Sequence, residues 1–147
     1  MKLIIYLMIF YLVPATAAPQ HSNINQENGL GISGYDPVTY FTLGRAVEGK
    51  RSLSEVHAGV TYYFSSQESR ELFKKDPAKY LPAYGGWCAY AMANGDKVKI
   101  DPETFKIIDG KLYLFYNFYF NNTLTKWNKD EVNLKNQADQ HWSRINR

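Results

Sequence analysis

Cysteine is almost absent from this sequence, with one residue, Cys88, in a chain of 147. A single cysteine excludes an internal disulfide framework. The sequence also lacks the paired-cysteine spacing of structural zinc sites and the His-Glu-x-x-His pattern of zinc peptidases. A glycine-rich phosphate loop and the Gly-x-Ser-x-Gly turn of serine hydrolases are missing as well. The common signatures of these enzyme classes are therefore not present.

Charge of one sign is not concentrated in any part of the chain. Lys and Arg number 17 against 14 Asp and Glu, which gives a net charge of +3. No basic stretch gathers on one element, so nucleic acid is not an expected partner. Aromatic residues, by contrast, make up 16% of the sequence, and 12 of them are tyrosines. That content is enough to build a packed core.

Long hydrophobic runs are also scarce. The run from Leu3 to Val13 has eleven apolar residues, whereas about 20 are needed to cross a bilayer. Lys2 precedes this run, and Ala15 and Ala17 follow it in the small-x-small pattern that a signal peptidase reads. We therefore predict a signal peptide over residues 1–17 and a cut after Ala17. The mature protein is expected in the periplasm or outside the cell, with no membrane contact after cleavage.

The rest of the chain has the length of one domain. Residues 18–33 are polar and lack periodicity, so we expect a flexible lead-in. Residues 34–147 are expected to form the domain, with a helical extension at its C-terminus.

Local signals predict a series of short elements. The Asp-Pro pairs at Asp36 and Asp76 each favour the start of a helical turn. Two strands are expected within residues 47–66, joined by a turn at Ala58-Gly59. Ser66 is expected to cap the helix that follows, which would direct Phe73 into the core.

The second half of the chain predicts two helices and a hairpin. Residues 86–95 read as a two-turn helix that Gly95 ends. Asp109-Gly110 is a strong signal for a two-residue hairpin turn. Further on, apolar residues at helical spacing extend to Trp142, with a break expected near residues 128–133. The predicted fold class is α+β, a small single domain in which short antiparallel strands and hairpins pack against several short helices and a C-terminal helix.

Three segments together resemble exported bacterial proteins built on a YHS domain. They are "GYDPVTYFTLGRAVEG", "GVTYYFSSQESRELFKKDPAKYLPAYGGWCAYAMANG" and "KIDPETFKIIDGKLYLFYN". The resemblance covers about residues 34–118 and is carried by order and spacing. It implies an exported binding module and an association with heavy-metal handling.

The resemblance does not extend to the thiolates of the metal-type members. Their pattern places cysteines at three positions that are Thr39, Ser65 and Ser69 in this sequence. A hydroxyl is a poor ligand for a soft metal compared with a thiolate. The resemblance therefore implies the scaffold without the thiolate site, and Cys88 lies outside the pattern.

Cys88 and Met92 suggest a different, smaller metal site. On a helix they stand four residues apart and would share a face. A thiolate beside a thioether suits Cu(I), and His57 is the best candidate for a third ligand. The leading prediction is a non-enzymatic module that binds a copper-type transition metal ion or an unknown periplasmic protein.

Two alternatives remain open. Buried Cys and Met are ordinary core residues, and the protein would then be a structural or protein-interaction module that has lost its metal site. Cys88 could also serve a thiol-dependent enzyme as its nucleophile or redox thiol.

Overall fold

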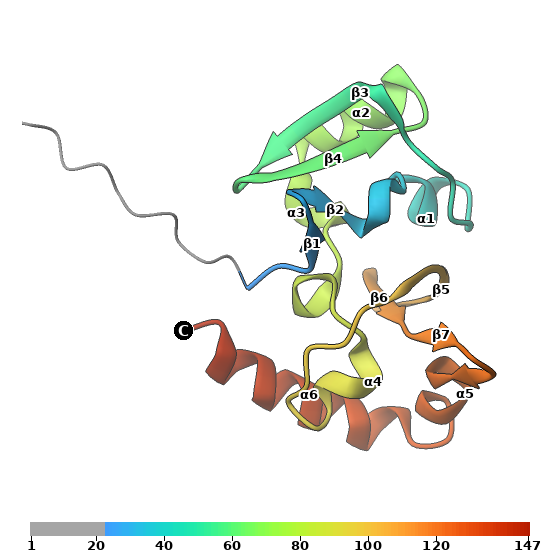
Figure 1. Cartoon of the computed structure of the whole chain (residues 1–147), viewed down its shortest axis with the longest axis vertical. Helices are drawn as coiled ribbons and strands as arrows, with labels where there is room; N and C mark the ends of the chain where they lie inside the picture. The colour runs from blue at the N-terminus through green and yellow to red at the C-terminus, as the bar shows by residue number, and fades with distance from the viewer. Residues whose placement is uncertain (1–22) are drawn as a thin grey trace, which may run out of the picture.

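A computed structural model describes residues 23–147 (Figure 1). The predicted signal peptide, its cleavage site after Ala17 and residues 18–22 of the expected lead-in lie outside the described residues. The elements form one α+β domain with a C-terminal helix, which confirms the predicted fold class. In Figure 1 a sheet and helix α2 occupy one end of the molecule, and helices α4 and α6 occupy the other. None of the helices within residues 23–147 is long and apolar enough to cross a membrane.

The largest sheet has four strands in the order β1-β2-β4-β3. Its bounds are β1 (Gln26–Glu27), β2 (Leu30–Gly31), β3 (Lys50–His57) and β4 (Val60–Phe64). Strands β3 and β4 are antiparallel, as predicted for residues 47–66, and His57 pairs with Val60 across the turn.

Residues 23–33 of the expected lead-in contain short strands and backbone hydrogen bonds to the rest of the fold. Strand β2 runs parallel to β4, with Leu30 opposite Thr61, and the Thr61 amide donates to the Gly29 carbonyl at 2.7 Å. The Asn25 amide likewise donates to the Gly85 carbonyl at 2.8 Å. Backbone hydrogen bonds hold this segment, and such bonds leave no periodic pattern of side chains in strands of two residues.

Short helices follow the first sheet strands. Turn η1 (Ile32–Gly34) and helix α1 (Thr39–Thr42) precede β3, and helices α2 (Gln67–Lys75) and α3 (Pro77–Tyr80) follow β4. Ser66 caps α2 as predicted, because its side chain accepts a hydrogen bond from the Ser69 amide. Helix α1 begins at Thr39, and the Asp-Pro pair at Asp36 starts the turn that leads into it, since Asp36 Oδ1 accepts a hydrogen bond from the Val38 amide at 2.9 Å.

The second half carries two hairpins and the C-terminal helices. Turn η2 (Ala83–Gly86) leads into α4 (Ala89–Met92), which has one turn instead of the predicted two because the backbone of Cys88 is not helical and Cys88 is the N-cap residue. The later elements are β5 (Asp101–Ile108), β6 (Lys111–Phe115), β7 (Asn117–Phe118), β8 (Asn121–Asn122), α5 (Thr123–Trp127) and α6 (Glu131–Ile145).

Two predictions for this half are confirmed. Ile108 pairs with Lys111 across Asp109 and Gly110, and both turn residues have positive φ, at 50° and 72°. The apolar stripe near the C-terminus is interrupted between α5 and α6, where the break was expected.

The core consists of two clusters. One lies around the four-stranded sheet and α2 and includes Phe64 and Phe73, whose rings are 5.1 Å apart between centroids. The other lies among α4, α5 and α6 and includes Met92 and Trp127. The prediction that Phe64 and Phe73 are both buried is confirmed.

Candidate functional site

Cys88 is completely buried and is used inside the fold. Its Sγ accepts a hydrogen bond from the Tyr116 amide at 3.3 Å and lies 3.4 Å from the Thr123 hydroxyl. Its own amide donates to the Val98 carbonyl at 3.0 Å. These bonds join the start of α4 to the segments on either side of the β5–β6 hairpin and to α5.

The other two predicted metal ligands have separate surroundings. Met92 lies in the second core cluster, whereas Cys88 lies in the first, because the cap geometry of Cys88 removes it from the helical face. His57 ends β3, and its ring stands edge-on to Phe73 at 6.0 Å. No group of three His, Cys, Asp or Glu side chains within residues 23–147 could hold a metal ion. A copper site on Cys88, Met92 and His57 stays a prediction without geometric support.

The three positions at which the YHS pattern has cysteines lie around one cavity. Thr39, Ser65 and Ser69 all line a space of about 390 Å³ beside α1 and α2. Two of their hydroxyls already serve the fold, since Ser65 Oγ donates to the Asp36 carboxylate at 2.7 Å and Thr39 Oγ1 donates to the Asp36 carbonyl at 3.0 Å. The cavity therefore presents hydroxyls where a soft metal would need thiolates.

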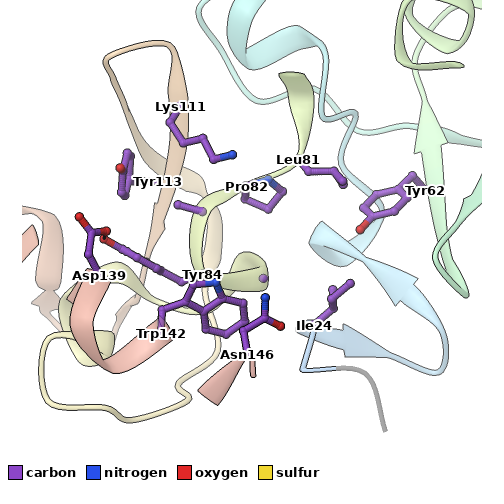
Figure 2. A pocket seen from close by; sticks show the side chains of 12 residues that line it. Ile24, Tyr62, Leu81, Pro82, Tyr84, Lys111, Tyr113, Asp139, Trp142 and Asn146 are labelled. Atoms are coloured by element: carbon purple, nitrogen blue, oxygen red, sulfur yellow. Dashed lines mark hydrogen bonds between the residues drawn. The ribbon is translucent and has the colours of Figure 1, made fainter. Parts of the chain in front are cut away.

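A second cavity, of about 430 Å³, forms where five parts of the chain meet (Figure 2). We call it the Tyr84 cavity. Its walls come from the N-terminal segment, β4, the α3–η2 segment, β6 and α6, and the lining residues are Ile24, Tyr62, Leu81, Pro82, Ala83, Tyr84, Gly85, Lys111, Tyr113, Asp139, Trp142 and Asn146. Much of this lining is aromatic or aliphatic, with a few polar groups, which is typical of small-molecule sites.

The backbone of η2 brings the aromatic walls together. Tyr84 adopts a φ of 54°, a region that costs free energy for a side chain larger than glycine. Gly85 follows with a φ of 60°, and a Cβ at that position would lie 2.8 Å from the Trp142 ring. The glycine thus allows the close approach that sets Tyr84 beside Trp142, with ring centroids 6.4 Å apart.

A chain of hydrogen bonds fixes the polar end of this aromatic wall. Tyr84 Oη donates to Asp139 Oδ1 at 2.8 Å, and Lys135 Nζ donates to Asp139 Oδ2, also at 2.8 Å. Burial, and then the bond to Asp139, raises the pKa of Tyr84. The hydrogen bond to Asp139 likewise raises the pKa of Lys135. At neutral pH Tyr84 is therefore a neutral donor, and Lys135 balances the charge of Asp139.

Burial also raises the pKa of two further tyrosines in the lining, Tyr62 and Tyr113. For Tyr62 the pKa rises to about 12. Both hydroxyls are therefore protonated at physiological pH and can donate a hydrogen bond. Neither is suited to accept a proton as a general base in this range.

Comparisons of the chain with protein-family profiles, with curated proteins and with solved structures find no match in any of the three. The chemistry of the site is therefore the basis for assigning a function.

The sequence did not indicate the Tyr84 cavity as a site. Its lining residues are spread from Ile24 to Asn146 and share no motif. One local signal was present, because alternation along β4 buries Val60, Tyr62 and Phe64 together. Tyr62 is the only one of these three with a polar group in its side chain. Because the residue is buried, its hydroxyl must either form a hydrogen bond or reach a cavity.

Proposed function

We propose that this protein is an exported binding module, YHS-like in scaffold and non-enzymatic, which holds a small aromatic ligand in the Tyr84 cavity. The observation that carries the proposal is the convergence of five chain segments on one cavity with aromatic walls and neutral hydroxyl donors. Such a lining suits an organic molecule better than a bare metal ion, which prefers charged or soft ligands.

The hydrogen bonds already made by Asp139 and Cys88 favour binding without catalysis. Asp139 accepts hydrogen bonds from both Tyr84 and Lys135, so its two oxygens already serve contacts within the fold. Cys88 is buried and bonded, away from the lining of this cavity. The scaffold part of the proposal is supported by Thr39, Ser65 and Ser69, which the resemblance relates to one another and which line one space.

A titration with a neutral aromatic probe tests the proposal. Asn146 lies exposed at the end of α6 and lines the cavity, so Asn146→Phe should fill its mouth without disturbing the core. Asn136→Phe is the matched control, because Asn136 is exposed on the same helix and does not line the cavity. By isothermal titration calorimetry, 2-naphthol should bind the wild type and Asn136→Phe saturably, and Asn146→Phe should bind it at least roughly tenfold more weakly.

Equal binding by both variants, or no saturable binding by the wild type, would contradict the proposal. Metal analysis of protein purified from the periplasm tests the competing prediction. Copper at one ion per chain that disappears in Cys88→Ser would favour the metal site instead.

A further inference from the structure

The Tyr62 hydroxyl borders the Tyr84 cavity and has no hydrogen-bond partner within residues 23–147. Tyr62 is 1% exposed, and it lines the Tyr84 cavity. Within residues 23–147 no side-chain N or O atom is both buried and without a hydrogen-bond partner, so the Tyr62 Oη, which has no partner in this part of the chain, is reached from the cavity. This hydroxyl is therefore free to form a hydrogen bond with a ligand atom in the cavity.

The charge of the lining favours an anion. Asp139 is neutralised by Lys135, at 2.8 Å. Lys111, on β6, has no ion pair with any carboxylate in the described part of the chain. The cavity therefore presents one uncompensated positive charge, which a ligand carboxylate could balance.

The two groups reach the cavity from opposite walls. Figure 2 shows the Lys111 amine extending toward Pro82 and the Tyr62 hydroxyl directed inward from the far side. Tyr84 and Trp142 supply flat aromatic surface in the same cavity. A ligand that satisfies all of these groups needs an anionic end, a flat body and a second polar atom.

We infer that the ligand is a flat aromatic carboxylate with a hydrogen-bonding substituent at its other end. Its carboxylate bonds to Lys111 Nζ, its ring system packs on Tyr84 and Trp142, and its substituent bonds to Tyr62 Oη. This inference rests on the proposed function, since it names the class of ligand for the same cavity.

Three related probes separate the contributions of the two groups. The probe 6-hydroxy-2-naphthoate carries both polar ends, 2-naphthoate lacks the hydroxyl, and 2-naphthol lacks the carboxylate. Their affinities are measured for the wild type, Tyr62→Phe and Lys111→Met. Lys75→Met is the control for net charge, because Lys75 is exposed on α2, outside the cavity.

We expect 6-hydroxy-2-naphthoate to bind the wild type most tightly. Tyr62→Phe should weaken its binding by roughly 3- to 10-fold and leave 2-naphthoate nearly unchanged, as for the loss of one hydrogen bond. Lys111→Met should weaken both carboxylates by about tenfold and leave 2-naphthol unchanged, and Lys75→Met should have no such effect. The carboxylate affinities should also fall with added salt.

Equal affinity of the wild type for all three probes would overturn the inference and leave the proposed function standing, because 2-naphthol still binds. That comparison uses only the wild-type protein, so it holds even if Tyr62→Phe does not fold. An equal loss of both carboxylates in Tyr62→Phe would likewise overturn the assignment of the substituent to Tyr62 Oη.

Discussion

Replacement of Asp36 should destabilise the fold far more than replacement of the other aspartates that precede a proline. Asp36 is completely buried, and its carboxylate accepts three hydrogen bonds. Oδ1 accepts from the Val38 amide at 2.9 Å, and Oδ2 accepts from the Ser65 amide at 2.8 Å and from Ser65 Oγ at 2.7 Å. The side chain thus joins the start of α1 to the end of β4.

The loss of stability follows from the hydrogen-bond donors that would no longer have an acceptor. In Asp36→Ala the buried Val38 amide and the partly buried Ser65 amide lose their acceptor, and each unpaired buried group costs about 1–3 kcal/mol of unfolding free energy. We therefore expect a loss of about 3–5 kcal/mol, a large part of the 5–15 kcal/mol typical of a domain. Asp36→Asn should cost about 2–4 kcal/mol, because its amide nitrogen would face the two Ser65 donors.

Asp76→Ala is the matched control. Asp76 also precedes a proline, but it is exposed and its side chain makes no capping hydrogen bond to α3. Its replacement should change stability by less than about 0.5 kcal/mol. Urea denaturation followed by tryptophan fluorescence and circular dichroism gives both values. If Asp36→Ala and Asp76→Ala unfold at the same urea concentration, the role assigned to the buried carboxylate is wrong.

Three further predictions concern the hairpin, the cysteine and the alkaline limb of stability. Gly110→Val should lower the free energy of unfolding by about 1 kcal/mol or slightly more. The reason is backbone strain alone, because φ is +72° and nothing lies within 4 Å of an added Cβ. An unchanged melting temperature would contradict this prediction. Cys88→Ser should lower the free energy of unfolding by about 1–2 kcal/mol. The native thiol should react slowly with a bulky thiol reagent until urea unfolds the protein. Rapid, complete labelling of the native state would favour the thiol-dependent enzyme over the binding module. Burial raises the pKa of Tyr62 to about 12 from 10.0, so the unfolded chain loses this proton first as pH rises and stability falls between these values. The stability difference between the wild type and Tyr62→Phe should therefore shift by about 2 kcal/mol against the wild type from pH 10 to 12, and parallel pH curves would refute the assignment.

Elements governed by neighbouring residues could be predicted from the sequence. The Ser66 cap of α2 and the Asp109-Gly110 turn are confirmed because each depends on a side chain and backbone within a few residues. The burial of Phe64 and Phe73 followed from alternation in a strand and from the apolar face of a helix.

Features that depend on distant parts of the chain could not be predicted in this way. The segment containing β2 is polar and short, and it is ordered by pairing with β4, about 30 residues later. Cys88 and Met92 have helical spacing, yet the helix begins after Cys88 and their side chains join different clusters. The Tyr84 cavity exists only when Ile24, Tyr62 and Trp142 are brought together by the tertiary fold.

The most direct test of the central claim is a map of where the ligand binds. Amide and indole resonances of ¹⁵N-labelled protein are followed by two-dimensional NMR during a titration with 6-hydroxy-2-naphthoate. Binding in the Tyr84 cavity predicts saturable shifts for the Gly85 and Lys111 amides and for the Trp142 indole N–H, with little change at Cys88. Shifts that leave these three resonances unmoved and gather at Cys88 would contradict it.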